Sequence, residues 1–475
     1  MSAQGASRHT SRAQPEPVSP ARREAFAILL GLEKGSAHAD DLLRGARVSK
    51  LSPQDRNLAT SLVMGALRWQ IQLDALVRPL LARPNARIDS EIRIALRLGA
   101  YQLLYLDRIP AHAAIGESVA LAKLAGHKFA SGMVNAVLRK LAAQSKPQAC
   151  PEGFAEATAH PRWMVDRWIS IYGPEITMAI CHHGQQQPEL TIRLSSAEAE
   201  ADLAGQGIEM EPGAILSASR SVLSGDVTAT QAFKAGHIRI QDEGSQLIAE
   251  LAGHGANILD CCAAPGGKTL ILAERNLHAK ITACEISPGR LEAMRRCIAE
   301  LNNPDLNDPD LGRIEFLQAD AAQLADEPQY DLILADVPCS GTGTLGRNPE
   351  IRHRLQPDDL LRHHQRQCAI LKGAMRAAAN KDGKPGRVLY STCSLEPEEN
   401  QDVIAEVLAE APEWQQISIA ESLSELRAEG RLTPSATAGL QQCITPEGAL
   451  SLLPGSMGVG IQTDGFFAAV LARQG

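Results

Sequence analysis

The chain has 475 residues, of which 44% are hydrophobic and 21% charged, and its formal net charge is -8. This length exceeds what one ordinary core requires and the composition is too apolar for a disordered chain, so we expect two or three domains. The longest apolar runs fall far short of the roughly 20 residues that span a bilayer, which argues against a membrane protein.

The N-terminal segment, residues 1–20, is polar and lacks the apolar centre of a secretory signal. It is typical of a disordered tail on a cytoplasmic protein. Ten cysteines occur along the chain, but apart from the adjacent Cys261 and Cys262 they are scattered, and no C-x-x-C pair is present. We therefore expect reduced thiols, no disulfide scaffold and no bound metal.

The charge is divided unevenly along the chain. Residues 1–150 contain 21 Lys and Arg against 11 Asp and Glu, a net charge of +10, which leaves -18 for the rest. A basic N-terminal third can follow a phosphate backbone even in an acidic protein, because such contacts depend on the local potential. A solvated helical surface would explain the same charge equally well.

Residues 21–145 show apolar residues at helical spacing, which predicts a helical bundle. One stripe runs from Leu73 to Leu81 and another from Val134 to Leu141, and Ser52 followed by Pro53 is a typical helix start. A stretch rich in Pro, Gly and polar residues, 142–153, reads as a linker. The region 154–235 mixes helical and strand patterns in the order of a small α+β module.

Residues 236–475 alternate strands with helices, which predicts a parallel sheet covered on both faces. The expected strands are ANILDC, ITACEI, RIEFLQ, YDLILADV, GRVLYS and GFFAAVLA. Two segments interrupt the alternation, 301–312 and 414–454, and we interpret both as surface insertions.

A cofactor turn is expected within ILDCCAAPGGKTLILAE, residues 258–274, which reads as a strand, a turn of small residues and a helix. Open parallel sheets bind ligands at such turns. Gly266 and Gly267 allow close approach to the backbone, and the helix N-terminus favours polar or anionic atoms. The spacing matches neither a dinucleotide fingerprint nor a phosphate loop, which favours a nucleoside ligand without a large phosphate group.

Three acidic residues end successive predicted strands. Glu285, 19 residues after Gly266, is placed to accept the hydrogen bonds of a ribose diol. Asp320 is placed to contact an adenine, and Asp336 ends the next strand. Taken singly, each acid could equally be a helix cap or part of a solvated loop.

Two cysteines, Cys339 in VPCSG and Cys393 in STCSL, lie just beyond predicted strands and hence on the same sheet edge as the cofactor turn. A free cysteine is often only a small buried apolar residue. These two, however, stand among polar turn residues, so we expect them to act as a pair.

Two thiols beside an adenosine-type cofactor indicate methylation at a pyrimidine carbon. C5 of cytosine is too weak a nucleophile to attack a methyl sulfonium unaided, but a thiolate that adds to C6 turns the ring into an enamine. The second thiol is a candidate for the release step, and an acid such as Asp336 could stabilise the protonated ring. The base must leave any stack to be reached.

These segments resemble the RNA 5-methylcytidine methyltransferases, which use S-adenosylmethionine. DCCAAPGGKT is similar to their cofactor motif, DVPCSGTGTLGRNPEIR to their proline-cysteine motif and YSTCSLEPEEN to their threonine-cysteine motif. The resemblance covers nearly the whole chain. Residues 21–145 look like a NusB-type helical RNA-binding domain, which points to the Sun (RsmB) branch acting on small-subunit ribosomal RNA.

The resemblance implies a NusB-like bundle, a small α+β RNA-binding module at residues 154–235 and a Rossmann-like S-adenosylmethionine-dependent methyltransferase domain at residues 236–475. It implies that Cys393 is the nucleophile and that Cys339 assists product release, with Asp336 as a third catalytic residue. We also expect a monomer with ribosomal RNA as its partner. The implied cofactor contacts are Cys262, Ala263, Ala264, Pro265, Gly266, Gly267, Lys268, Glu285, Asp320 and Asp336.

The chain departs from the family pattern at Glu285, where an aspartate is usual, at Ser195, where asparagine is frequent, and in the acidic segment 301–312. Basic residues follow the proline-cysteine motif, and we expect a basic rim that contacts RNA through Lys268, Arg347 and Arg352; a plain solvated helix is the alternative. The rim residues are Arg347, Arg352, Arg354, Arg362, Arg366 and Lys372.

The leading hypothesis is therefore an enzyme that methylates C5 of a cytidine in small-subunit (16S) ribosomal RNA. One alternative changes only the substrate, to transfer RNA or another ribosomal cytidine. Another, from a different class, is a non-catalytic RNA-binding or ribosome-assembly factor that retains the fold.

Overall fold

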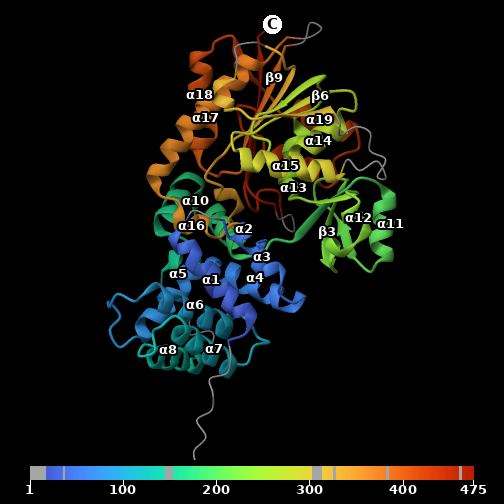
Figure 1. The fold of residues 1–475 in the computed structure, drawn as a ribbon. Coiled ribbons are helices and arrows are strands. Elements are labelled where there is room, and N and C mark those ends of the chain that lie inside the picture. Colours follow the sequence, from blue (N-terminus) through green and yellow to red (C-terminus); the bar gives the residue numbers. More distant parts are fainter. Residues whose placement is uncertain are drawn as a thin grey trace, which may run out of the picture. The chain divides into compact units, whose positions relative to one another are not determined.

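Figure 1 shows the computed structural model of the chain, which describes residues 18–35, 38–144, 153–301, 313–324, 328–380, 385–458 and 463–474. Most of the 1–20 tail, most of the linker and nearly all of segment 301–312 lie outside the described residues. The chain divides into two compact units, residues 1–165 with 348–350 and residues 166–347 with 351–475. No helix among the described residues is long and apolar enough to cross a membrane.

The first unit is a helical bundle, as the apolar spacing predicts. The Ser52 hydroxyl accepts a hydrogen bond from the Asp55 amide at 3.1 Å, and this cap together with Pro53 starts a helix where the sequence predicts one. Val134 and Leu138 are fully buried in the core. The helices are α1 (Pro20–Lys34), α2 (Ala39–Leu43), α3 (Ala46–Ser49), α4 (Pro53–Arg68), α5 (Gln70–Val77), η1 (Arg78–Leu80), α6 (Ser90–Tyr105), α7 (Ala111–Leu124), α8 (Ser131–Ala143) and α9 (Phe154–Ala157).

Helix α10 (Arg162–Gln185) leads into the second unit and bends at Gly173, whose φ is 79°, just before Pro174. It is followed by a small antiparallel sheet with the strand order β2-β3-β1-β4. This module combines helices and strands, as the sequence predicts. Its elements are β1 (Leu190–Leu194), α11 (Ala197–Gly205), β2 (Glu209–Pro212), β3 (Ser219–Ser224), η3 (Val227–Ala229), α12 (Gln231–Lys234) and β4 (Ile238–Ile240).

The large sheet has the order β10-β12-β9-β8-β5-β6-β7, and β11 pairs with β12. Strands β5 to β9 are parallel, whereas β12 runs antiparallel to β9. The strands are β5 (Asn257–Asp260), β6 (Lys280–Cys284), β7 (Ile314–Leu317), β8 (Leu332–Asp336), β9 (Arg387–Thr392), β10 (Trp414–Ile417), β11 (Leu450–Leu452) and β12 (Phe466–Arg473).

Helices cover both faces of this sheet, as expected (Figure 1). Alternate residues of β8 enter two separate cores: Leu332 and Leu334 enter one, and Ile333 and Ala335 enter the other. This is the period of two that a strand buried on both faces requires. The first core includes residues of α13 (Glu243–Leu251), α14 (Gly267–Arg275), α15 (Pro288–Leu301), α19 (Ala420–Ala428) and α20 (Ala436–Gln442), and the second those of α17 (Pro357–Ala377) and α18 (Gln401–Glu410).

The interpretation of residues 414–454 as a surface insertion is wrong. Trp414 is only 4% exposed and lies in β10, which extends the large sheet by pairing with β12. Leu423 and Leu440 belong to α19 and α20 and are buried in the core, and Leu450 starts β11. The segment is therefore part of the sheet edge and of one helical layer.

Candidate active site

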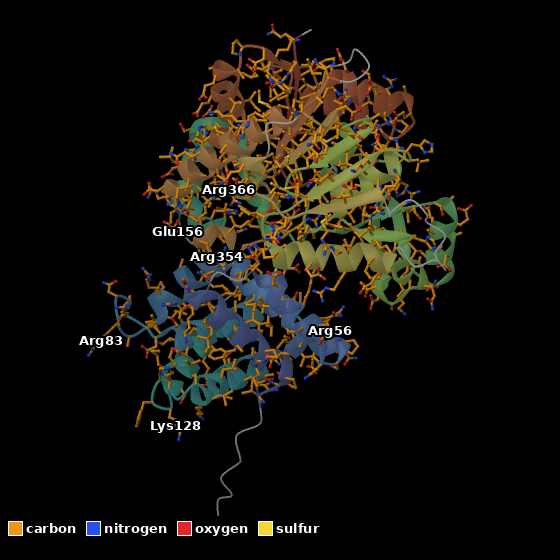
Figure 2. All side chains as sticks on the ribbon, turned by 45° about the horizontal axis from the view of Figure 1, so that its top comes forward. Arg56, Arg83, Lys128, Glu156, Arg354 and Arg366 are labelled. Atoms are coloured by element: carbon orange, nitrogen blue, oxygen red, sulfur yellow. The ribbon has the colours of Figure 1, made fainter. Side chains whose placement is uncertain are left out.

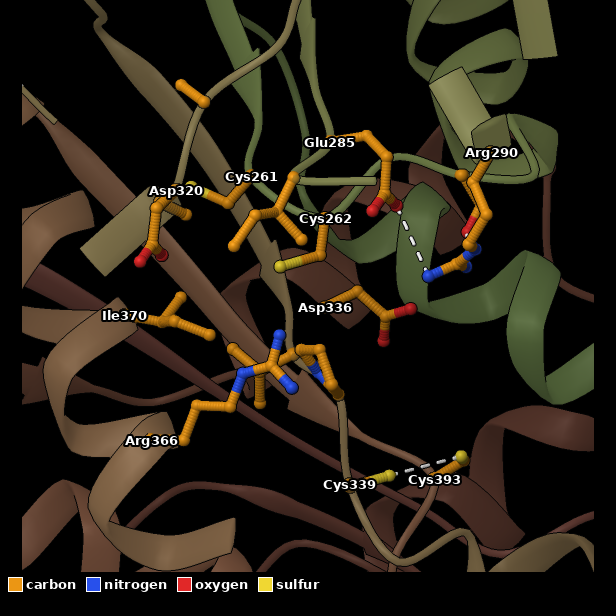
Figure 3. Close-up of a pocket in the computed structure, with 16 residues that line it drawn as sticks. Cys261, Cys262, Glu285, Arg290, Asp320, Asp336, Cys339, Arg366, Ile370 and Cys393 are labelled. Carbon is orange, nitrogen blue, oxygen red and sulfur yellow. Dashed lines mark hydrogen bonds and ion pairs between the residues drawn. The ribbon is translucent and has the colours of Figure 1, made fainter. Parts of the chain in front are cut away.

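A cavity of about 210 Å³ lies at the carboxyl ends of the parallel strands (Figure 3). Loops after neighbouring parallel strands leave the same edge of a sheet, so topology brings together residues that are far apart in the chain. Ile370 and Arg366 of α17 also line the cavity. The lining includes seven residues predicted from the sequence: Cys262, Ala264, Glu285, Asp320, Asp336, Cys339 and Cys393.

The two cysteines are neighbours, with their Sγ atoms 3.3 Å apart (Figure 3). Strands β8 and β9 are adjacent and parallel, and Asp336 pairs in register with Ser391. The loops that carry Cys339 and Cys393 therefore start side by side. The amide of Gly343, just beyond Cys339, donates a hydrogen bond to the Cys393 carbonyl oxygen at 2.9 Å and joins the loops again.

The environment of Cys339 keeps this thiol protonated. Its hydrogen bond with Cys393 and its burial raise the pKa of Cys339 well above the ordinary value, and the charges of Cys393 and Glu399 act in the same direction. A thiol that stays protonated can donate a hydrogen bond to a neighbouring thiolate. The distance between the two Sγ atoms fits a donor on either side, and the raised pKa of Cys339 favours this thiol as the protonated partner.

Lys268 places a positive charge at this end of the sheet. Its Nζ atom lies 2.7 Å from Asp336 Oδ2, while Asp336 Oδ1 accepts a hydrogen bond from the Ser391 hydroxyl at 2.7 Å. Burial lowers the pKa of Lys268, but the charges of Asp336 and Cys393 outweigh it, so the pKa is raised. Lys268 therefore stays charged beside Asp336 at this end of the sheet.

The cofactor turn has the predicted strand-turn-helix geometry. Gly266 has a φ of 108°, a conformation that favours glycine, and a Cβ atom here would lie 3.1 Å from Met294 Cγ. The turn backbone is formed by Ala263, which is buried, Pro265, which is exposed, and Gly267, which starts α14. The space beside Gly266 is filled by Met294, so glycine is needed here for packing and for the backbone conformation, and the turn residues that line the cavity are Cys262 and Ala264.

Asp260, at the end of β5, is an unpredicted residue beside this turn. Thr269 donates a hydrogen bond to Asp260 Oδ2 at 2.6 Å, but among the described residues buried Oδ1 has no partner. Burial raises the pKa of Asp260 to about 7, against the hydrogen bond from Thr269. An acceptor of this kind suits a ligand that brings a hydrogen-bond donor or a positive charge.

Glu285 and Asp320 stand at the edge of the same cavity. Glu285 Oε1 accepts a hydrogen bond from the Ser287 amide at 2.9 Å, and Oε2 lies 3.3 Å from an Arg290 nitrogen (Figure 3). Asp320 caps a short 3-10 helix, η6 (Ala321–Gln323), by accepting the Ala322 amide at 3.0 Å. Asp320 therefore has a capping role as well as a place in the cavity lining.

The predicted basic rim is wrong at Arg352. This residue of α16 (Ile351–Arg354) is 1% exposed and donates hydrogen bonds to the Gly184 carbonyl oxygen at 2.8 Å and the Leu345 carbonyl oxygen at 3.3 Å. Its guanidinium is a structural donor and cannot reach RNA. Backbone carbonyls satisfy a buried arginine in the way that buried polar groups require.

Arg347, the other arginine predicted to contact RNA, forms two ion pairs within the protein. Its Nε lies 2.7 Å from Asp464 and its Nη2 lies 2.8 Å from Asp242, and Asp464 is 2% exposed. The charge of Arg347 is therefore balanced within the protein. Among the other predicted basic residues, Lys372 pairs with Glu410, and Arg366 lines the cavity.

Sequence reasoning missed Ser391, which donates a hydrogen bond to Asp336, and Glu399, which accepts hydrogen bonds from the serines that follow Cys339 and Cys393. Ser391 is part of YSTCS, and its role follows from the pairing of β8 with β9. Glu399 is the last of three glutamates in EPEEN, and sequence alone does not tell which of them are buried. In the structure it is fully buried next to the cysteine loops.

Family models match three parts of the chain. They are the 16S rRNA methyltransferase RsmB/F family at residues 250–472, the NusB family at 19–143, and the ferredoxin-like domain of RsmF/B-like methyltransferases at 160–219. The matches confirm the expected fold class of a NusB-like bundle, a small α+β module and a methyltransferase domain.

Curated relatives match the chain over most of its length. A probable ribosomal RNA small subunit methyltransferase B from Bacillus subtilis strain 168 is 31% identical over 466 residues, which cover 95% of this chain and 98% of the relative. Ribosomal RNA small subunit methyltransferase B from Pseudomonas putida strain KT2440 is 34% identical and covers 86% of this chain and 94% of its own.

Solved structures share the fold. The crystal structure of PH0851 aligns with a TM-score of 0.72 at 22% identity and covers 96% of this chain and 100% of its own. NSun6 from Pyrococcus horikoshii, solved with SFG, aligns with a TM-score of 0.51 at 17% identity over 66% of this chain and 98% of its own. Taken with the near full-length curated relatives, these matches lead to one conclusion: the chain belongs to the ribosomal RNA small subunit methyltransferase B family.

Proposed function

We propose that this chain transfers a methyl group from S-adenosylmethionine to C5 of a cytidine in small-subunit ribosomal RNA, through a covalent bond between Cys393 and C6 of the base. The observation that carries the proposal is the pair of Sγ atoms, 3.3 Å apart, in a cavity that also includes the cofactor turn. The names of the curated relatives support the choice of ribosomal RNA.

The residues of the turn fit such a cofactor. Cys262 and Ala264 of the turn line the cavity, Glu285 supplies a carboxylate for ribose hydroxyls, and Asp260 Oδ1, beside the turn, is a buried acceptor without a partner among the described residues. Asp320 supplies a further acceptor at the cavity edge for a base amine. When bound, S-adenosylmethionine provides an electrophilic methyl group.

Cys393 is the nucleophile in this proposal because its partner stays protonated and Lys268 is close by. In the proposed reacting state the Cys339 thiol donates a hydrogen bond to Cys393 across the 3.3 Å between their Sγ atoms, and the Lys268 ammonium, paired with Asp336, adds positive charge at the same edge of the sheet. Asp336, fixed by Lys268 and Ser391, lies in the same cavity and can stabilise a ring that is protonated at N3.

The reaction then balances in two stages. The Cys393 thiolate bonds to C6 of the flipped-out cytosine, and the electron pair of the C5–C6 double bond makes C5 nucleophilic. After C5 has taken the methyl group, a solvent water takes up the C5 proton, the electrons of that C–H bond re-form the C5–C6 double bond, and the Cys393 thiolate leaves C6, which restores the aromatic ring. Cys339 assists this stage by hydrogen bonding to the departing sulfur.

The test compares two single variants with the parent protein. Cys393→Ala should abolish methyl transfer to unmethylated small-subunit RNA, because no adduct can form. In Cys339→Ala, Cys393 should still attack the base but the product should be released slowly, so that a protein–RNA adduct accumulates. Labelled cofactor measures transfer, and denaturing gels measure the adduct.

The double variant Cys339→Ala/Cys393→Ala is the control and should form no adduct. Adduct formation by Cys393→Ala but not by Cys339→Ala would show that Cys339 is the nucleophile and that Cys393 assists release. Parallel reactions with transfer RNA and large-subunit RNA test the substrate, and preferential label in either would overturn the choice of small-subunit RNA.

A further inference from the structure

The two cysteine loops share one buried carboxylate. Glu399, at the end of η8 (Pro397–Glu399), is fully buried. Glu399 Oε1 accepts a hydrogen bond from the Ser340 amide at 2.8 Å, and Oε2 accepts hydrogen bonds from the hydroxyls of Ser340 and Ser394. Ser340 directly follows Cys339, and Ser394 directly follows Cys393.

Glu399 has no spare acceptor capacity for an unrelated role. Gln367 of α17 donates a fourth hydrogen bond, to Oε1 at 3.0 Å, and its amide nitrogen also lies 3.0 Å from the carbonyl oxygen of Pro338, next to Cys339. Each carboxyl oxygen therefore accepts two hydrogen bonds and donates none. Hydrogen bonds to a buried carboxylate are among the strong ones, so this contact fixes both loops.

In the hydrogen bond between Ser394 and Glu399, the Ser394 hydroxyl is the donor. It accepts a hydrogen bond from the Glu396 amide at 3.0 Å and so presents its own proton to Glu399. In Glu399→Gln the side-chain NH2 group would face serine hydroxyls that already donate toward position 399, and two donors cannot bond to each other. The link between the two loops depends on the charged acceptor rather than on the shape of the side chain alone.

We propose that Glu399 is the positioning residue that holds the sulfur atoms of Cys339 and Cys393 in contact, and that product release depends on it. This inference rests on the proposed function for its consequence in catalysis, but not for the geometry. Glu399 acts through Ser340 and Ser394 and is absent from the cavity lining. Replacing Glu399 should increase the distance between the Sγ atoms of Cys339 and Cys393 while both thiols remain present.

The first experiment measures the distance between the thiols without RNA or cofactor. Diamide oxidises two adjacent thiols to a disulfide and takes up their two protons and two electrons. In the parent protein the Cys339–Cys393 disulfide should form readily, and in Glu399→Gln it should form about tenfold more slowly, which corresponds to about 1.4 kcal/mol. Peptide mapping by mass spectrometry identifies this disulfide among the other cysteines.

Glu396→Gln is the matched control. Glu396 lies in the same loop, is equally buried, and accepts hydrogen bonds from Arg167 at 2.6 Å and Trp168 at 3.0 Å rather than from the cysteine loops. This variant should lose stability but close the disulfide at the parent rate. Ser394→Ala, which keeps Glu399 and removes one link, should slow closure as Glu399→Gln does.

The second experiment measures the consequence for release. Glu399→Gln should accumulate the protein–RNA adduct as Cys339→Ala does, with kcat about tenfold lower and KM for RNA unchanged, whereas a merely destabilised protein would lose activity without an adduct. Parent-rate disulfide closure in Glu399→Gln overturns the positioning role. Slow closure with no adduct in either Glu399→Gln or Cys339→Ala instead overturns the proposed function.

Discussion

Arg347 joins two acidic side chains that come from distant parts of the chain. Burial raises the pKa of Asp242 to about 6, the charge of Asp464 adds to this, and Arg347 opposes it. His183 Nε2 lies 3.1 Å from the other oxygen of Asp464. This cluster keeps two carboxylates buried only because the guanidinium lies between them.

We predict that Arg347→Gln destabilises the protein by about 2 kcal/mol at pH 8 and by less at pH 5. The pKa of Asp242 is higher in the folded than in the unfolded state, so its protonated form stabilises the folded protein. This stabilisation is present at low pH and is lost as the pH rises from about 4 to about 6. Without the arginine that pKa rises further, and protonation at pH 5 relieves the repulsion between the acids. Urea unfolding at both pH values measures the difference.

Arg362→Gln is the control, because Arg362 is 71% exposed and its ion pair, with Asp359, lies within its own helix. It should change the unfolding free energy by less than about 0.5 kcal/mol. An equal loss at both pH values in Arg347→Gln would show that the carboxylates do not depend on this charge.

At the scale of elements, the contact between η7 (Thr342–Thr344), the end of β9 and the start of β12 holds the cysteine loops on the sheet. Gly343 donates to the Cys393 carbonyl oxygen at 2.9 Å and accepts from the Gly465 amide at 2.8 Å. A Cβ atom on Gly343 would collide with the Gly465 carbonyl oxygen and lie 2.9 Å from Cys393 O. The three segments meet too closely for any side chain.

Gly343→Ala should therefore cost about 1–3 kcal/mol of stability, since the backbone must shift to accept one methyl group. It should also slow adduct release, because the shift moves Cys393 relative to Cys339. Gly289→Ala in α15 is the control: a Cβ atom there meets nothing within 4 Å, so stability should stay constant or rise by about 0.5 kcal/mol. Equal unfolding midpoints for both variants would contradict this packing argument.

Strand patterns predicted the parallel sheet because residues such as Leu332 to Ala335 are apolar on both faces and lie between turn residues. The neighbouring thiols followed from the same topology. The burial of Arg352 and Trp414 could not be predicted from strand patterns. A buried arginine and an aromatic residue in an added strand depend on partners such as Gly184 and Arg473, and local sequence does not encode these distant contacts.

At the scale of the whole molecule, basic charge is concentrated in the first 150 residues, whose net charge is +10 by sequence. Several of these side chains are exposed on the helical unit, and Figure 2 shows Arg83 and Lys128 extending outward from it. The exposed basic residues in this part include Arg78, Arg83, Arg87, Arg108, Lys123, Lys128, Arg139 and Lys140.

We predict that Arg83→Gln/Lys128→Gln weakens RNA binding and makes it less dependent on salt. Removing one phosphate contact should reduce the slope of log K against log salt by about 0.7–0.9, so this pair should reduce it by about 1–2. Lys280→Gln/Arg295→Gln is the control, since it removes two exposed charges, 59% and 50% exposed, from the net acidic second unit. Titration of RNA at several salt concentrations measures both slopes. An unchanged slope in Arg83→Gln/Lys128→Gln would mean that these charges only solvate the helical surface, since counterion release depends on the phosphates that are neutralised rather than on net charge.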